Sequence, residues 1–202
     1  MKKFVLLLAL ALTGFAANAQ IKRPKLVVGI IIDQMRCDYL NYCCDQYCDG
    51  GFKRLISAGF SCDNDRINYL PTVTAIGHTS TYTGATPAIH GIAGNSFQID
   101  GKDVYCCKDT TVESVGSKND AGRMSPCNLL STTIGDQIRL ATDFNSKVIG
   151  VALKDRAAIL PAGRSANAAY WYDTKAGKFV TSTYYMPQLP KWVNKFNGKI
   201  KI

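Results

Sequence analysis

The sequence predicts an α/β fold, a layered sandwich in which helices cover a largely parallel central sheet. Two continuous apolar, β-branched runs, 25–32 and 147–153, are typical of strands buried on both faces of a parallel sheet. Segments of helical periodicity lie between them, and strands alternating with helices indicate α/β architecture. The chain has 202 residues, enough for one domain with a substantial core.

The first nineteen residues are expected to be a signal peptide, outside the fold. Two lysines precede an apolar run from residue 4 to about residue 12, and Ala-Asn-Ala follows, the small-residue pattern that precedes cleavage. This run is shorter than the roughly 20 residues that a membrane helix needs, although a retained N-terminal anchor is the alternative. We therefore expect an exported, periplasmic protein without a stable membrane span, folded over residues 20–202.

Each further element has its own signal. A helix is predicted over 51–59, with Gly59 near its end. The apolar residues at helical spacing are Phe52, Leu55, Ile56 and Phe60. Residues 71–74 read as a strand-to-helix turn with Thr74 at or near the helix start. Residues 133–142 carry Ile134, Ile138 and Ala141 on one helical face. Residues 168–173 and 178–185, joined by Thr-Lys-Ala-Gly, predict a hairpin.

The charge of the chain bears on which molecules it could bind. Without Lys2 and Lys3 the chain keeps 22 basic residues against 15 acidic ones. The basic residues are scattered, without aromatic platforms, so we expect a solvated surface and no nucleic-acid partner.

Eight cysteines in an exported chain favour disulfides. A zinc knot is the rival interpretation, but adjacent pairs at 43–44 and 106–107 do not match zinc-ligand spacing.

Both apolar runs end in charged residues. The first stops at Asp33, and the second is followed by Lys154 and Arg156. Ligands of open α/β sheets bind at the carboxyl ends of the strands, where a carboxylate could hold a metal and two cations could hold an anion. The alternative is that Asp33 caps a helix and that the basic pair is only solvated. From the residues alone, the two interpretations carry equal weight.

Residues 70–84 contain six serines and threonines, which raises the question of a nucleophile. A serine-hydrolase interpretation lacks the G-x-S-x-G motif, and His78 and His90 are expected to be structural. A metal ion is the other way to activate a hydroxyl, because it lowers the hydroxyl pKa. Thr74 at a helix start, with Asp33 as metal ligand, would then be the nucleophile.

Three segments together resemble one superfamily. LVVGIIIDQMR, YLPTVTAIGHTSTYTGATPAIHGIAGN and VALKDRAAILPAG are similar to the alkaline phosphatases, and most similar to the exported, PafA-like bacterial branch with a threonine nucleophile. Type I phosphodiesterases and nucleotide pyrophosphatases share part of the pattern. The resemblance covers residues 24 to about 197. It implies an alkaline-phosphatase-like three-layer sandwich, incomplete at its C-terminal side, and a phosphate-ester small molecule as substrate.

The resemblance also implies roles for single residues. Asp33 would bind zinc, and Thr74 would contact zinc and become phosphorylated. Asn95 would donate a hydrogen bond to a phosphoryl oxygen, and Lys154 and Arg156 would hold the remaining oxygens. This Lys-x-Arg pair favours monoesters, because a monoester presents three non-bridging oxygens.

Most of the ligands for the family's two zinc ions have no counterpart in this sequence. Neither histidine matches a ligand position, and no Asp-His or Asp-x-x-x-His motif occurs. Residues 20–202 would therefore be the N-terminal part of a phosphatase catalytic domain. We expect this chain alone to be inactive and to expose apolar sheet edges. A phosphodiesterase or nucleotide pyrophosphatase, and a truncated, non-catalytic exported protein, are the alternatives.

Overall fold

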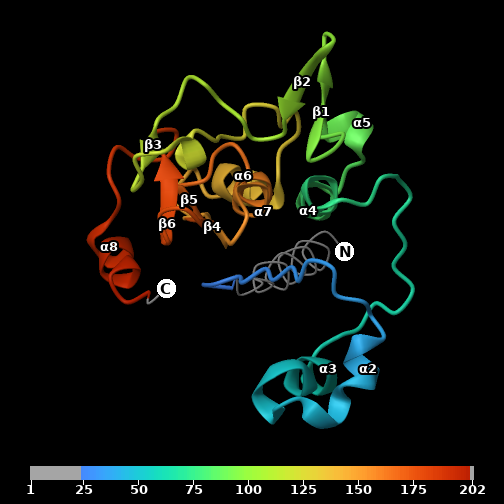
Figure 1. Cartoon of the computed structure of the whole chain (residues 1–202). Coiled ribbons are helices and arrows are strands. Elements are labelled where there is room, and N and C mark those ends of the chain that lie inside the picture. Colours follow the sequence, from blue (N-terminus) through green and yellow to red (C-terminus); the bar gives the residue numbers. More distant parts are fainter. Residues whose placement is uncertain (1–23, 201–202) are drawn as a thin grey trace, which may run out of the picture. The chain divides into compact units, whose positions relative to one another are not determined.

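The structure is a computed structural model that describes residues 24–200 (Figure 1). Two compact units divide the chain, one up to Gln34 and one from Met35 onward. The predicted signal peptide lies outside the described residues. Within residues 24–200, no helix has the length and apolarity to cross a membrane.

The described part of the first unit is the segment predicted as a buried central strand. Residues 25–32 form no strand, and their apolar side chains are largely exposed, Leu26 by 79% and Ile30 by 72%. A strand is defined by hydrogen bonds to a neighbouring strand. Residues 24–34 contain no strand to pair with this segment, and the two units are not placed relative to each other, so the buried central strand stays a prediction.

The second unit begins with short helices. These are α2 (Tyr39–Tyr42), η1 (Cys44–Gln46), η2 (Asp49–Lys53) and α3 (Arg54–Ala58). The last two cover the predicted helix 51–59, which confirms helical structure there. Its apolar side chains are not buried, however: Leu55 is 57% exposed and Phe60 is 92% exposed.

A four-stranded mixed sheet organises the rest of the second unit. Its order is β3 (Ser114–Val115), β6 (Lys178–Ser182), β5 (Ala168–Asp173) and β4 (Ile149–Ala152). β4 and β5 are parallel, whereas β5–β6 and β6–β3 are antiparallel. The strand predicted at 147–153 and the predicted hairpin are both confirmed.

Alternate residues of β5 pack against different layers. Ala169 and Trp171 share one apolar cluster with Ile159 of α7 (Asp155–Ala162). Ala168 and Tyr170 share another with Val193 of α8 (Lys191–Asn197). Helices therefore cover both faces of the sheet, which confirms the predicted three-layer α/β fold. The described sheet is mixed rather than largely parallel, because only one of its three strand pairs is parallel. Burial of one side chain such as Ile159 contributes about 1.5–3 kcal/mol.

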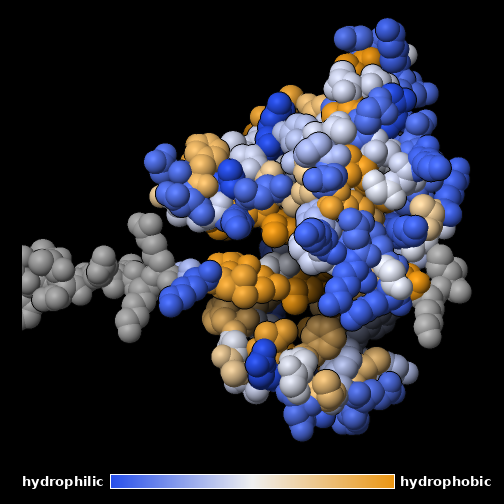
Figure 2. Space-filling view, turned by 90° about the vertical axis from the view of Figure 1, so that its left-hand side faces the viewer, coloured by the Kyte–Doolittle hydropathy of each residue, from blue (hydrophilic) through white to orange (hydrophobic). Residues whose placement is uncertain are grey.

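β4 lies at the edge of this sheet and is buried on one side only. Ile149 is 53% exposed and Val151 is 61% exposed, whereas the alternate residues Gly150 and Ala152 are half-buried. The prediction that this strand is buried on both faces is therefore wrong for the described residues. Figure 2 shows that apolar residues, in orange, lie open on one face of the molecule.

Helix α6 (Ile134–Ala141) confirms the prediction for 133–142 and begins with a capping box. The Thr133 side chain accepts from the Asp136 N–H, and the Asp136 carboxylate accepts from the Thr133 N–H. Asp136 also accepts from Ser165, and together such bonds lower its pKa although burial acts to raise it. Gly163 has a φ of +85°, and a Cβ there would lie 2.3 Å from the Asp136 carboxylate.

A two-stranded hairpin, β1 (Ser96–Ile99) and β2 (Lys102–Tyr105), stands outside the main sheet. This hairpin was not predicted. Asp100 and Gly101 form its two-residue turn with φ values of 51° and 74°. An Asp-Gly dipeptide with two positive φ angles is the type I′ hairpin signal, so the turn was readable from the sequence.

The predicted disulfides are not found in the described residues. All eight cysteines lie in the described residues, and all are unpaired. Cys106 and Cys107 are buried, with their sulfur atoms 3.9 Å apart, whereas Cys127 and most of the cysteines of residues 37–62 are exposed.

Candidate active site

Thr74 is the first residue of helix α4 (Thr74–Thr83), as predicted. Val73 precedes it in an extended conformation and is the N-cap residue. The first N–H groups of a helix have no carbonyl partner within the helix and favour an anion. Thr74 therefore lies where a helix start can attract a negatively charged group.

Asn95 is held against this helix start. Its Oδ1 accepts from the N–H of Ala75 over 3.0 Å, and its backbone carbonyl accepts from the N–H of Cys106 over 3.0 Å. Because Oδ1 is engaged, the Nδ2 group is the part of the amide suited to donate to a ligand. The structure thus brings Asn95 beside the residue that follows Thr74.

The histidine–serine contact in this region does not form a nucleophile–base pair. His90 Nδ1 accepts from the N–H of Ile92 over 3.1 Å, so the proton of the ring lies on Nε2 and is donated to Ser80 Oγ at 2.9 Å. Burial lowers the pKa of His90, which keeps the ring neutral. His90 is fully buried and structural, as expected, and it cannot take a proton from Ser80.

Lys154 and Arg156 lie at the start of α7, directly after β4. Lys154 is the N-cap residue, and Arg156 is in the first turn. Arg156 Nη1 donates to the Tyr105 hydroxyl at 2.9 Å, and that hydroxyl donates to Asp155 Oδ1 at 2.8 Å. Burial and the Asp155 carboxylate raise the pKa of Tyr105 well above its usual value, so the phenol stays neutral.

A cavity of about 540 Å³ lies beside this helix start. Its lining includes Tyr105, Lys154, Arg156, Trp171 and Asp173. Thr74 and Asn95 do not line it. The cavity therefore adjoins the basic pair rather than the predicted nucleophile.

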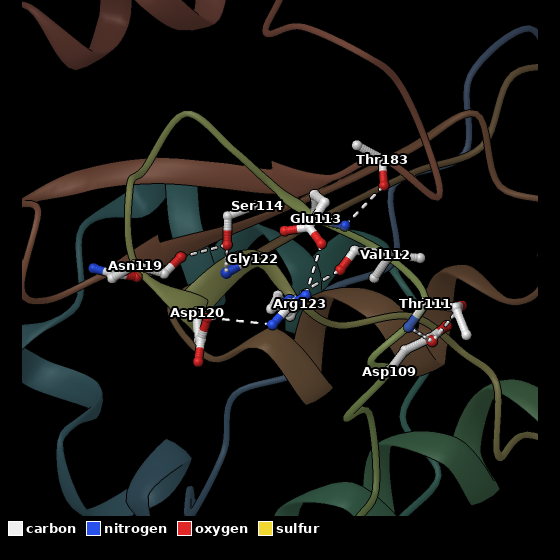
Figure 3. Close-up of polar contacts among 10 residues, drawn as sticks. All are labelled: Asp109, Thr111, Val112, Glu113, Ser114, Asn119, Asp120, Gly122, Arg123 and Thr183. Atoms are coloured by element: carbon white, nitrogen blue, oxygen red, sulfur yellow. Dashed lines mark hydrogen bonds and ion pairs between the residues drawn. The ribbon is translucent and has the colours of Figure 1, made fainter.

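The loop that forms one wall of this cavity is held by its own polar contacts (Figure 3). Arg123 donates to Glu113 over 2.7 Å and to the carbonyl of Val112 over 3.3 Å. The Ser114 hydroxyl bonds to the Asn119 carbonyl and accepts from the N–H of Gly122. Residues 119–121, which line the cavity, are thus fixed to the sheet through β3.

Asp33 belongs to the first unit, and the structure does not place it relative to Thr74. Within the described part of the chain, no cluster of three or more His, Cys, Asp or Glu side chains could hold a metal ion. Asp33 and Thr74 offer oxygen ligands of the kind that zinc accepts, but zinc takes about four ligands. These two residues alone do not make a two-zinc site.

Tyr105 and Asp155 were not predicted as site residues. Neither residue stands out in a motif, because their importance comes from contacts with each other across 50 positions of the chain. The type I′ turn would have placed Tyr105 opposite Ser96, one residue after Asn95, but no sequence pattern indicates its contact with Arg156.

Comparisons with known proteins identify the family of the chain. The model of the type I phosphodiesterase / nucleotide pyrophosphatase family matches residues 27–201. Alkaline phosphatase PafA from Elizabethkingia meningoseptica is 54% identical over 203 residues, which cover 98% of this chain and 37% of the relative. A protein from Myroides odoratus, named calcium-transporting ATPase, is 57% identical over 90% of this chain and 33% of its own length.

The same fold is found in a solved structure. The crystal structure of wild-type PafA matches with a TM-score of 0.87 and 57% identity, covering 89% of this chain and 35% of that one. A solved PafA variant, with one threonine changed to serine and an asparagine, a lysine and an arginine changed to alanine, matches with a TM-score of 0.86. This chain spans about a third of the length of these relatives.

The matched family model extends over nearly the whole described chain, and the helix starts at Thr74 and Lys154 belong to a fold shared with a solved alkaline phosphatase. The chain therefore belongs to the type I phosphodiesterase / nucleotide pyrophosphatase family and is similar within it to PafA-like alkaline phosphatases.

Proposed function

We propose that the full-length protein hydrolyses phosphate monoesters through a phosphothreonine intermediate on Thr74. The observation that carries this proposal is the pairing of Asn95 with the start of α4, next to Thr74, over 3.0 Å. A nucleophile and a phosphate-binding amide are thereby brought to one helix start. The basic pair at the start of α7 is connected to the same hairpin through Tyr105.

The solved PafA variant supports the choice of residues. Its substituted threonine and asparagine are 21 positions apart, as are Thr74 and Asn95. Its substituted lysine and arginine are two positions apart, as are Lys154 and Arg156. The four residue types and these two spacings match those that the sequence analysis selected.

The proposed chemistry gives each residue one task. The Thr74 oxygen bonds to phosphorus while the bond to the leaving oxygen breaks, and the proton that Thr74 loses reaches the leaving group through water. Water then releases phosphate and restores the Thr74 hydroxyl. Asn95 Nδ2 and the cations of Lys154 and Arg156 bind the non-bridging oxygens, whose charge is best held by preorganised donors. These donors suit the three oxygens of a monoester.

Zinc is the cofactor that the family resemblance implies, and in the full-length protein it would lower the pKa of the attacking hydroxyl. Asp33 and Thr74 would be two of its ligands. The remaining ligands have to come from residues other than these, so we propose that the 202-residue chain alone has almost no activity. Export to the periplasm through residues 1–19 belongs to the same proposal.

Two alternatives remain. The family description favours hydrolysis of phosphodiesters or nucleotide pyrophosphates, and the name of the Myroides relative makes ATP a necessary test substrate. The other is a non-catalytic exported protein that at most binds anions, for which inorganic phosphate is the probe.

One assay separates these functions. The full-length protein, with zinc present, is given p-nitrophenyl phosphate, bis-p-nitrophenyl phosphate and ATP at equal concentrations. We expect kcat/KM to be highest for the monoester p-nitrophenyl phosphate. A preference for the diester, or for cleavage of ATP between its α- and β-phosphates, would replace this proposal by the phosphodiesterase or pyrophosphatase function. Phosphate binding without turnover of any substrate would favour the non-catalytic protein.

A further inference from the structure

The base of the β1–β2 hairpin connects the two helix starts of the proposed site. Asn95 directly precedes β1, Tyr105 ends β2, and Ser96 pairs with Tyr105 across the hairpin. The Cys106 N–H donates to the Asn95 carbonyl, which closes this base. Asn95 reaches the start of α4, and Tyr105 reaches the start of α7. Figure 1 shows the hairpin close to α4 and α5.

The direction of each hydrogen bond around Tyr105 is fixed by chemistry. Arginine can only donate, and an ionised carboxylate can only accept. The Tyr105 hydroxyl must therefore give its proton to Asp155 Oδ1, at 2.8 Å, and accept from Arg156 Nη1, at 2.9 Å. Asp155 Oδ1 lies 3.7 Å from Arg156 Nη1, so the phenol lies between the carboxylate and the guanidinium as an oriented bridge.

The Arg156 side chain is mostly buried and does not use all its donors. Its side chain is only 19% exposed, and its Nε is buried without a hydrogen-bond partner among the described residues. A buried donor without a partner is unfavourable, so such a donor marks a place for a ligand or a water molecule. Tyr105 engages Nη1 and leaves the remaining donors of the guanidinium for that ligand.

We propose that Tyr105 is the positioning residue of Arg156: its hydroxyl, oriented by Asp155, fixes the guanidinium for binding phosphoryl oxygens. This inference rests on the proposed function, because it takes Arg156 as a phosphate-binding group. It adds that one hairpin base sets the position of both Asn95 and Arg156. In this role Tyr105 acts through Arg156 and not by contact with the substrate.

The test is a double-mutant cycle in the full-length protein. Tyr105→Phe, Arg156→Ala and the double variant are compared with the wild type by kcat/KM for p-nitrophenyl phosphate and by the inhibition constant of inorganic phosphate. Tyr105→Phe keeps the ring and removes one hydrogen bond to a charged group, so we expect kcat/KM to fall about tenfold and phosphate inhibition to weaken. In the Arg156→Ala background the same change should have no further effect.

Tyr184→Phe is the matched control. The Tyr184 hydroxyl donates to the carbonyl of Arg164 over 2.7 Å, and it contacts neither Arg156 nor Asp155 through a hydrogen bond. This variant should keep the wild-type kcat/KM and phosphate inhibition. The urea midpoint of each variant shows that it is folded.

Three results would overturn the inference in distinguishable ways. Equal losses from Tyr105→Phe in both backgrounds would mean a role that does not pass through Arg156. Wild-type activity and phosphate inhibition in Tyr105→Phe, together with a clear loss in Arg156→Ala, would remove the positioning role and leave the proposed function in place. Wild-type kinetics in Arg156→Ala would instead remove the phosphate-binding role of Arg156, and the positioning role with it.

Discussion

Helices α3 and α4 of the second unit differ in apolar spacing and in burial, and the two differences run in opposite directions. α3 carries the clear apolar spacing, yet none of its residues is buried. α4 is rich in hydroxyls and has no marked apolar stripe, yet it buries Ala75, Ile76 and three polar residues and contacts α7. Periodicity predicts that a helix forms, whereas partners distant in sequence decide whether it is buried.

The sharpest test of this comparison removes one hydroxyl from each helix. Thr74→Val in the full-length protein keeps the side-chain shape and removes the proposed nucleophile, so phosphatase turnover should fall by at least about 10³-fold. The matched control is Ser57→Ala on α3, whose hydroxyl bonds only weakly to the Arg54 carbonyl at 3.4 Å. It should leave kcat unchanged. Surviving activity in Thr74→Val would show that another group attacks.

A core substitution tests the difference in burial. Ile159→Ala in α7 removes a fully buried side chain and should lower the free energy of unfolding by about 2–5 kcal/mol. Leu55→Ala in α3 should cost less than about 1 kcal/mol, because Leu55 is 57% exposed. Urea unfolding of the full-length protein measures both. An equal cost at Leu55 would break the comparison and mean that the full-length protein covers α3.

The smallest effect concerns the buried carboxylate that caps α6. Hydrogen bonds lower the pKa of Asp136 in the folded state despite burial, so it stabilises the fold above the carboxyl's unfolded pKa of about 3.9. This stability is lost as the pH falls through the lower folded-state pKa. Asp136→Asn should cost about 1–3 kcal/mol at pH 7 and flatten the decline of stability below about pH 4. Urea midpoints between pH 3 and 7 measure it, and an unchanged profile would contradict the capping role.

Local signals predicted much of the fold. The hairpin of residues 168–182 and the helix after Thr133 were found because their turn and apolar patterns lie within a few residues. The segment 25–32 was predicted as a central strand because its composition fits one, but a strand also needs a neighbouring strand, which composition does not identify. Its pairing stays a prediction.

The same difference between local signals and long-range contacts applies to the candidate site. Thr74 at a helix start and the basic pair after β4 followed from local order along the chain. The contact between Arg156 and Tyr105 did not, because it joins residues 51 positions apart and depends on how a hairpin docks against a helix. The relation of Asp33 to Thr74 stays a prediction.

The two adjacent buried thiols next to Tyr105 give this hairpin base a natural reporter. Cys106 and Cys107 are fully shielded, whereas five cysteines of the chain are exposed and Cys43 is half-buried. An alkylating reagent therefore modifies the exposed thiols without any opening of the fold. It reaches Cys106 and Cys107 only when the hairpin base opens. Mass spectrometry of peptides spanning residues 106–107 would thus time the opening of the region beside Arg156 without any engineered label.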